Sequence, residues 1–481
     1  MKEFWNLPDL KKAKSRRMEH VNVDYSFSLP IEVQGIGNHK KFYLRTYGCQ
    51  ANFRDGETIA GLLMAMGFSE TSTPEQADVI LLNTCAIREN AENKVFGEIG
   101  NLKHLKLKNP DLIMGVCGCM AQEETVINRI LSKHHHIDLI FGTHNIHRLP
   151  YLLHHTMFTK EKTIEVYSKE GDIIENLPDH RFGSVKAWVN IMYGCDKFCT
   201  YCIVPYTRGK ERSRLMDDIV KEVIQLKQQG FKEITLLGQN VNAYGKDLDV
   251  EEGFAKLLQK VSDTKIDRIR FTTSHPWDFT NAMIDVIVAN DNIMPAIHLP
   301  MQSGNNDILR LMGRRYSIEQ YKKLFDDLKA AIPNCAFSTD IIVGFPNETE
   351  QQFRQTLDMM DYCKFDQVFS FIFSPRSSTP AASFDDSIPM EVKKERLARL
   401  NEKIKHYAHE NNQKYINKTV NVLVDGPSKK DKTIFSGYTE QNKLVNFTGK
   451  DVLTGQIVPV KIHEAKSWFL VGELMTSPFD E

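Results

Sequence analysis

The 481-residue chain has no long hydrophobic run and almost no net charge. No stretch of about 18 apolar residues occurs, so no transmembrane helix is expected. The first residues carry clustered basic side chains and no apolar leader, which argues against a secretory signal. A formal net charge of −1 gives no general attraction to nucleic acid, so such a partner would bind through local patches. We therefore expect a cytoplasmic monomer without a membrane partner.

The sequence also lacks the pattern of a disulfide-stabilised protein. Its nine cysteines are an odd number, and the chain is long enough to bury several cores without covalent cross-links. Cysteines in such a chain indicate metal or redox chemistry. No internal repeat and no low-complexity tract is present.

Hydrophobic periodicity divides the first part of the chain into three segments. Residues 1–40 show no sustained pattern and are expected to form an irregular arm. Strand and helix patterns alternate over 41–155, which predicts an open parallel α/β sheet. Residues 156–183 are polar and are expected to form a linker. The candidate strands of the first sheet are 41–49, 78–85, 112–119 and 137–143.

The rest of the chain predicts two further domains, so the fold class is multidomain α/β. Six strand–helix units over 184–417 predict a central partial barrel, (βα)6, whose reactive groups gather at the C-terminal ends of its strands. From 418 to 478 the period changes to two, and five short strands predict a small antiparallel β-barrel of a kind that binds oligonucleotides. The candidate strands of the central barrel are 186–193, 233–237, 268–273, 296–300, 336–343 and 367–372.

A first group of cysteines, Cys195, Cys199 and Cys202, has the spacing C-x3-C-x2-C directly after the first predicted barrel strand. Three thiolates are one short of the usual four for a 4Fe–4S cluster. An incomplete set leaves one iron open to a substrate, as open catalytic zinc sites do. The alternatives are buried cysteines or a zinc site, but zinc needs a fourth ligand and the loop offers no further cysteine or histidine.

A second group, Cys49, Cys85 and Cys119, is widely spaced, yet each cysteine ends a predicted parallel strand. The C-terminal ends of such strands converge on one edge of the sheet, so the three could hold a second cluster. A single strand-end cysteine is usually a small buried hydrophobe, but three equivalent positions favour a shared role. Cys117 is a possible rival of Cys119. Two other cysteines are assigned to packing, Cys335 and Cys363.

With an aromatic residue before its last cysteine, the C-x3-C-x2-C motif resembles that of the radical S-adenosylmethionine (SAM) superfamily. In that superfamily the open iron binds SAM, and an electron from the reduced cluster releases a 5′-deoxyadenosyl radical. The resemblance implies that Tyr201 lies against the adenine. It also implies SAM contacts from Gly238, Gln239, Asn240, Gln302, Asp340 and Ile342.

The strings at 47–52, 83–89 and 117–122 resemble the N-terminal domain of methylthiotransferases, in which these cysteines bind an auxiliary 4Fe–4S cluster. The resemblance covers about residues 40–478. It implies two 4Fe–4S clusters, with SAM serving both as methyl donor and as radical source. In the family the auxiliary cluster carries the sulfur that is transferred. The sequence itself identifies no catalytic acid or base.

Further strings resemble the MiaB-type branch of the family, and the C-terminal strings resemble the TRAM domain. The resemblance implies methylthiolation of C2 of N6-isopentenyladenosine at position 37 of tRNA, with an electron donor such as flavodoxin or ferredoxin. Alternative substrates are threonylcarbamoyladenosine in tRNA and an aspartate of a ribosomal protein. A different class, a non-catalytic RNA-binding iron–sulfur protein, is also open. The strings are 204–214, 273–276, 298–304, 426–430 and 442–447.

Two groups of basic residues are candidates for RNA binding. They suit phosphate contacts, which position RNA without reading its sequence. The alternative is an ordinary solvated loop. The first group follows the cysteine loop and the second lies at one turn of the C-terminal barrel. The candidates are Arg208, Lys210, Arg212 and Arg214, and then Lys429, Lys430 and Lys432.

Overall fold

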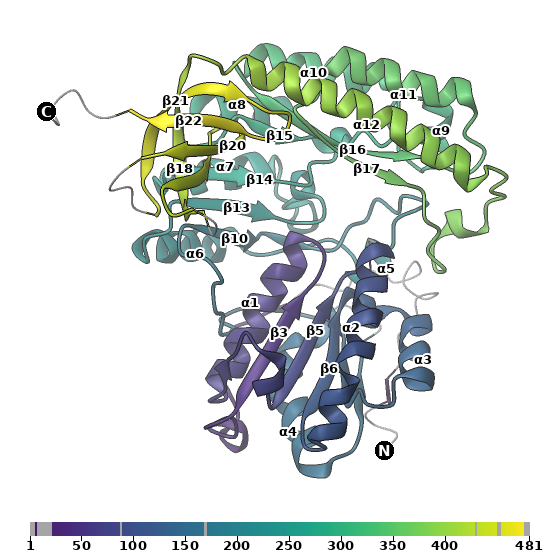
Figure 1. The fold of residues 1–481 in the computed structure, drawn as a ribbon, viewed down its shortest axis with the longest axis vertical. Helices are drawn as coiled ribbons and strands as arrows, with labels where there is room; N and C mark the ends of the chain where they lie inside the picture. Colours follow the sequence, from purple (N-terminus) through teal and green to yellow (C-terminus); the bar gives the residue numbers. More distant parts are fainter. Residues whose placement is uncertain are drawn as a thin grey trace, which may run out of the picture. The chain divides into compact units, whose positions relative to one another are not determined.

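The computed structural model describes residues 5–6, 22–86, 89–167, 171–428, 431–449 and 454–475. The chain forms two compact units, which are treated separately below (Figure 1). In the described residues no helix combines the length and the apolar character that crossing a membrane requires. The first unit comprises Met1–Phe182, Met192–Arg214 and Arg376–Thr379. The second comprises Gly183–Ile191, Leu215–Pro375 and Pro380–Glu481.

The first unit is built on a seven-stranded parallel sheet, which confirms the predicted open α/β fold. The register pairs Thr46 with Asn83 and Asn83 with Cys117, so β3, β5 and β6 end nearly level with one another. Across the sheet the strands are β1 (Trp5–Asn6), β8 (Thr163–Glu165), β7 (Leu139–Phe141), β6 (Ile113–Gly118), β5 (Val79–Thr84), β3 (Lys41–Thr46) and β4 (Ser69–Glu70).

Helices cover both faces of this sheet. Strand β5 is apolar at every core position because its side chains alternate between two buried faces. Ile80 and Leu82 pack in the core under α2 (Glu89–Lys108) and α3 (Glu124–Lys133). Val79 and Leu81 point to the other face and pack in the core under α1 (Gln50–Ala65) and α4 (Leu149–Thr159).

Two expectations for the first unit need correction. The segment 1–40 is not wholly irregular, because it supplies β1 and also β2 (Val23–Asp24), which pairs with β9 (Ile173–Ile174). The expected linker 156–183 supplies β8, a strand of the main sheet. The strands within these polar segments have only two or three residues, which is too short to show a strand period. They form only by pairing with residues distant in the sequence.

The second unit begins with six parallel strands in chain order, which confirms the predicted partial barrel. A bridge between Ile269 and Ile293 continues the pairing from the first three strands to the last three. The strands are β10 (Lys186–Asn190), β13 (Glu233–Leu237), β14 (Arg268–Phe271), β15 (Ala296–His298), β16 (Ala336–Val343) and β17 (Gln367–Ile372). The helices between them are α6 (Met216–Gln228), α7 (Gly253–Asp263), α8 (Asn281–Ala289), α9 (Asn306–Leu311), α10 (Ile318–Ala331) and α11 (Glu350–Cys363).

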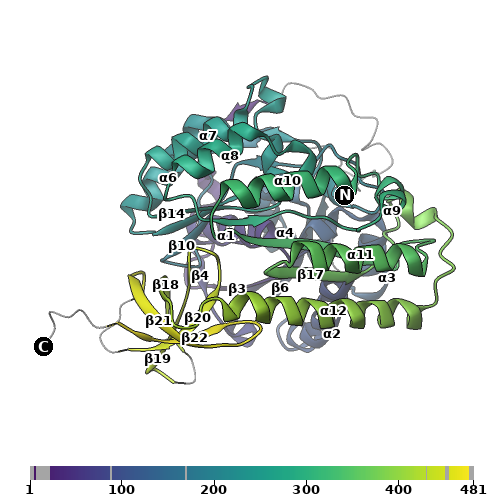
Figure 2. The same ribbon diagram turned by 90° about the horizontal axis from the view of Figure 1, so that it is seen from above.

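A long helix, α12 (Met390–Gln413), leads to a closed five-stranded barrel at the C-terminal end of the unit (Figure 2). The barrel was expected to be antiparallel, and four of its five strand pairs are. The exception is the pair β20 and β22, which run parallel. Strand β21 lies between them in the sequence but pairs with β22 on the side away from β20. The strands are β18 (Thr419–Pro427), β19 (Ile434–Tyr438), β20 (Leu444–Thr448), β21 (Ile457–Ala465) and β22 (Leu470–Leu474).

Two buried arginines of β14 attach this small barrel within the second unit. Arg268 donates to the carbonyl oxygens of Asn421 and Tyr438 at 3.0 and 2.8 Å. Arg270 donates to the carbonyls of Thr439 and Glu440 at 2.8 and 2.9 Å. These four bonds are made to the main chain of the barrel, and two ion pairs, Lys186–Asp425 and Asp366–Lys443, add side-chain contacts.

We expect Arg268→Met to destabilise the second unit by about 2–4 kcal/mol, because two hydrogen bonds from a buried, charged guanidinium would be lost. Calorimetry of the full chain would record this as a lower unfolding temperature for the unit. Arg310→Met is the matched control, since Arg310 is exposed and makes only a surface ion pair with Asp307. Equal unfolding temperatures for the two variants would contradict the proposed role of Arg268.

Candidate functional site

The cysteines at the strand ends gather at one edge of the first unit's sheet. Cys49 immediately precedes α1, Cys85 directly follows β5, and Cys119 begins a short 3-10 helix after β6. Because β3, β5 and β6 are neighbours in the sheet, the residues that follow them meet at its C-terminal edge.

Gly48 allows the first two of these cysteines to approach each other. Its φ is +116°, and a Cβ there would stand 2.2 Å from the Cβ of Cys85 and 3.0 Å from its sulfur. No residue with a side chain fits this position. The thiol of Cys85 donates a hydrogen bond to the sulfur of Cys49. The two sulfur atoms are therefore close enough to act on one ligand.

The thiols of this edge differ in their readiness to ionise. The hydrogen bond from Cys85, with help from the positive charge of Arg208, lowers the pKa of Cys49 to about 6. Burial raises the pKa of Cys119 to about 12, although Arg208 opposes the increase. Burial raises the pKa of Cys117 well above its usual range, and its side chain packs in the core beside α1 and α4. Cys117 thus behaves as a core residue.

In reduced, metal-free protein, we expect iodoacetamide to alkylate Cys49 with half-maximal rate near pH 6, because the thiolate is the nucleophile. Mass spectrometry of peptides labelled at several pH values would measure this. Cys335 is the internal control, since it is also half-buried but burial raises its pKa to about 12. A midpoint near 9 for Cys49 would contradict the prediction.

Arg208 lies among the strand-end cysteines, not on the surface. Its Nε donates to the sulfur of Cys119 at 3.1 Å, and its Nη2 donates to Asn52 and Asp55 at 2.8 and 2.6 Å. The sequence analysis did not identify Asn52 and Asp55. They lie on α1 directly after Cys49, one turn apart on the same face, and this helical spacing is the signal that could have revealed them.

Three of the expected RNA contacts are therefore corrected. Arg208, Arg212 and Arg214 are each less than a tenth exposed. Arg212 donates to the carbonyl of Gly171, and Arg214 forms a two-pronged ion pair with Glu175. Their partners are distant in sequence, so a run of basic residues resembled a phosphate-binding loop. Lys210 is half-buried and Lys432 is exposed, whereas Lys429 and Lys430 lie outside the described residues.

The C-x3-C-x2-C loop belongs to the same compact unit as the strand-end cysteines. A short antiparallel pair, β11 (Met192–Tyr193) and β12 (Arg212–Ser213), closes the base of this loop. The N–H of Cys195 donates to the carbonyl of Gly209, and that of Cys202 to the carbonyl of Cys199. Cys199 is buried, and the other two thiols are half-buried. Tyr201 is also half-buried within the loop.

The loop also packs on the strand-end site. Phe198, Ile203 and Tyr206 form one apolar cluster with Ala86 and Cys119. The two groups of cysteines are therefore held by the same local packing.

The donor sets fit iron–sulfur clusters better than single ions. Each group supplies three thiols and no nitrogen ligand, and thiolates are the ligands of 4Fe–4S clusters. Among the described residues, no three histidine, cysteine or acidic side chains converge as a single metal ion requires. Three thiols without an imidazole are the donor set of a 4Fe–4S cluster that keeps one iron open.

In the second unit, three of the residues expected to contact SAM come together. The N–H of Gln302 donates to the carbonyl of Asp340, and the N–H of Ile342 donates to the carbonyl of Gln302. Asp340 and Ile342 point to the same side of β16, because they are two residues apart on a strand. The carboxylate of Asp340 lies 3.3 Å from Nε2 of His298 on β15.

The expected contacts Gly238, Gln239 and Asn240 follow the C-terminal end of β13. Asn240 is buried and donates to Asp278 at 2.8 Å, and Asp278 also pairs with Lys246 at 2.6 Å. Near these residues in sequence, Ser274 Oγ and Asn242 Oδ1 are buried and have no hydrogen-bond partner in the described residues. Buried polar atoms of this kind suit a polar ligand such as SAM. The sequence analysis had not identified Asp278 and Lys246.

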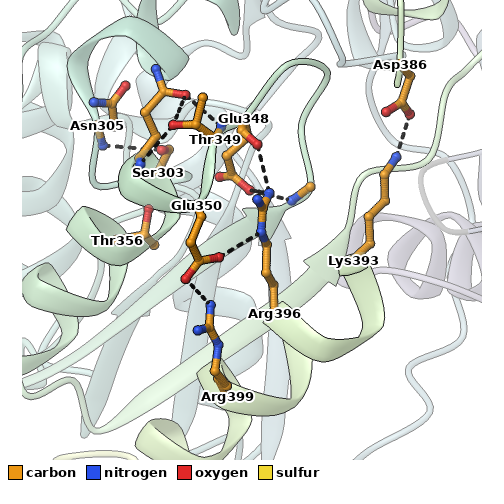
Figure 3. A network of polar contacts seen from close by, with 12 residues as sticks. Ser303, Asn305, Glu348, Thr349, Glu350, Thr356, Asp386, Lys393, Arg396 and Arg399 are labelled. Atoms are coloured by element: carbon orange, nitrogen blue, oxygen red, sulfur yellow. Dashed lines mark hydrogen bonds and ion pairs between the residues drawn. The ribbon is translucent and has the colours of Figure 1, made fainter. Parts of the chain in front are cut away.

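A polar network fixes the loops beside β16 (Figure 3). Glu348 accepts from the N–H of Gly344 and from Arg396 of α12, at 2.8 and 3.0 Å. Arg399 of α12 pairs with Glu350 at 2.8 Å. Burial raises the pKa of Glu348 to about 7. These contacts tie α12 to the loop that follows the strand carrying Asp340 and Ile342.

Comparison with known proteins gives three matching family models. Uncharacterized protein family UPF0004 matches residues 41–142, the Radical SAM superfamily matches 189–360, and the TRAM domain matches 413–475. A solved radical SAM methyltransferase from Kitasatospora setae, with cobalamin and a [4Fe-4S] cluster bound, has a TM-score of 0.51 at 13% identity. The match covers 71% of this chain and 77% of that one, and indicates a shared fold only.

Curated relatives match almost the whole chain. The tRNA-2-methylthio-N(6)-dimethylallyladenosine synthase of Bacillus cytotoxicus is 58% identical, and the match covers 98% of this chain and 93% of the relative. The synthase of the same name from Geobacillus kaustophilus is 57% identical, with 98% and 89% covered. The chain therefore belongs to the family of tRNA-2-methylthio-N(6)-dimethylallyladenosine synthases, which are radical SAM enzymes.

Proposed function

We propose that this chain transfers a methylthio group to C2 of N6-isopentenyladenosine at position 37 of tRNA. Cys195, Cys199 and Cys202 hold the radical SAM cluster. The auxiliary cluster is held by the strand-end cysteines Cys49, Cys85 and Cys119. Both clusters are of the 4Fe–4S type, and SAM serves as methyl donor and as radical source.

The observation that carries the proposal is the packing of both cysteine groups within one compact unit. A radical generator alone does not explain a second, separate set of three thiols at a sheet edge. The C2–H of adenine is neither acidic nor attached to a leaving group, so polar substitution there is difficult. A radical can remove this hydrogen, and sulfur must then be available nearby.

When bound, the reduced cluster supplies the electron that cleaves SAM to a 5′-deoxyadenosyl radical. The residues of the chain bind and orient the reactants. Gln302, Asp340 and Ile342 present backbone and carboxylate groups along one side of β16, and Asn240 is held in place by Asp278. These groups of the second unit orient SAM, together with the chain from Gly238 to Gln239. For Tyr201 in the first unit, a contact with the adenine is proposed from the family resemblance alone.

The tRNA binds through its anticodon loop, where a base is readily extruded from the stack. The C-terminal barrel has the architecture of oligonucleotide-binding domains, and the basic residues Lys429, Lys430 and Lys432 contact phosphates. Lys210 is a further phosphate contact. The enzyme acts as a cytoplasmic monomer and receives electrons from a low-potential donor such as flavodoxin or ferredoxin.

Nucleoside mass spectrometry tests the reaction. Anaerobically reconstituted protein should convert isopentenylated tRNA to its 2-methylthio derivative, with SAM and a reductant present. The same tRNA without the isopentenyl group is the matched control and should remain unmodified. Equal product from both tRNAs, or product only from threonylcarbamoylated tRNA or from ribosomal protein, would contradict the proposed substrate. A protein that binds tRNA and iron but forms no 5′-deoxyadenosine would instead be a non-catalytic iron–sulfur protein.

A further inference from the structure

Arg208 joins the two cysteine groups of the first unit. It follows Cys202 by six residues and ends the short helix α5 (Val204–Thr207). Its backbone therefore belongs to the loop of the first cysteine group, whereas its guanidinium lies within the second group, beside Cys119. A segment of chain and one side chain thus connect the two sites directly.

The guanidinium divides its donors between a thiol and a carboxylate. Nε–H points to the sulfur of Cys119, and both Nη atoms contact Asp55, at 2.6 and 3.4 Å. Asn52 accepts from Arg208 and also from the thiol of Cys119, at 2.8 and 3.4 Å. Arg208 is 5% exposed and Asp55 is 7% exposed. A buried ion pair is not an efficient source of stability, so its position beside a ligand sulfur indicates a functional role.

We propose that Arg208 is a positioning residue that tunes the auxiliary cluster through a hydrogen bond to the sulfur of Cys119, with Asp55 as the opposing charge. The inference rests on the proposed function, because it takes Cys119 as a ligand of that cluster. Hydrogen bonds to ligand sulfurs and the local net charge both set the potential of an iron–sulfur cluster. The donor and the positive charge of Arg208 make the cluster easier to reduce, and Asp55 limits the effect.

Replacing Arg208 and replacing Asp55 should shift the midpoint potential of the auxiliary cluster in opposite directions. Arg208→Met removes the donor and the positive charge, so the midpoint potential should become more negative. Asp55→Asn preserves the shape of the side chain and removes the negative charge, so the potential should become more positive. Arg208→Lys keeps the charge without the Nε–H group and should give a smaller negative shift than Arg208→Met. A purely structural role would not produce opposite signs.

The measurement uses the full chain carrying Cys195→Ala, Cys199→Ala and Cys202→Ala, so that only the auxiliary cluster is present. Each variant is reconstituted anaerobically, its iron is counted, and its cluster is titrated with EPR detection. Arg214→Met is the matched control. Arg214 is a similarly buried arginine of the same segment, but both prongs of its guanidinium pair with the carboxylate of Glu175. Its variant should leave the potential unchanged.

The outcomes separate this inference from the proposed function. If the background protein holds no cluster, the auxiliary site itself is wrong and both proposals are overturned. If it holds a cluster whose potential is the same in the Arg208 and Asp55 variants, only the tuning role is overturned. If Arg208→Met cannot retain the cluster, Asp55→Asn decides, because a positive shift supports the inference and an unchanged potential overturns it.

Discussion

Replacing Cys49, Cys85 and Cys119 together by alanine is expected to abolish methylthiolation of tRNA and to leave reductive cleavage of SAM intact. The three thiols share one edge of the sheet, and no other group in the proposal holds the sulfur that is transferred. Iron should fall from about eight to about four per chain, because one of two 4Fe–4S clusters is lost. The measurements are iron analysis, quantification of 5′-deoxyadenosine, and mass spectrometry of the tRNA nucleosides.

Cys117→Ala is the matched control for this experiment, since Cys117 lies two residues before Cys119, within β6, but packs in the core. It should retain both clusters and product formation, with only a modest loss of stability from the deleted sulfur. Loss of iron from this variant would show that Cys117, and not Cys119, is the third ligand. Eight irons in the triple variant would refute the strand-end site altogether.

The second large effect is expected from Cys195→Ala, Cys199→Ala and Cys202→Ala combined. This variant should form neither 5′-deoxyadenosine nor methylthiolated tRNA, because in the proposed function the electron that cleaves SAM comes from the cluster held by this loop. It should still retain about four irons in the auxiliary site. Its ultraviolet–visible and EPR spectra would therefore report a protein with one cluster that is unable to start the reaction.

Cys363→Ala is the control, because it also removes a cysteine thiol but at a position far from the loop in sequence. Cys363 ends α11, and burial raises its pKa to about 12, as expected for a thiol that only packs. The variant should keep iron content and SAM cleavage near their original values. Residual 5′-deoxyadenosine in the loop variant would mean that the electron reaches SAM from another site.

The sequence predicts the sheets well because their patterns are local. Strand β5 begins with four apolar residues and β6 has no charged or amide side chain, and each is followed by a cysteine, so parallel pairing alone brings these cysteines to one edge. The adjacency of Cys49 and Cys85 depends in addition on Gly48, which the string around Cys49 contains. The prediction of the strand-end site therefore rests on the strand patterns and on the string around Cys49.

The roles of the arginines could not be predicted from local pattern. Asp55, the partner of Arg208, is 153 residues away, and Glu175 is 39 residues from Arg214. Because the sequence alone does not show these partners, four basic residues in one loop resemble a phosphate-binding surface. The strands β1 and β8 were missed for a related reason, since each is short and is stabilised by pairing with distant residues.

The attachment of the C-terminal barrel through Arg268 and Arg270 has a consequence for protein engineering. The four acceptors are backbone carbonyls, and a carbonyl is present whatever side chain the residue carries. These four hydrogen bonds are therefore independent of the side chains that the barrel carries, whereas the ion pairs Lys186–Asp425 and Asp366–Lys443 require two particular barrel residues. A barrel with the same backbone, with Asp425 and Lys443 retained, could therefore be placed on β14 while its other outward-facing residues are exchanged.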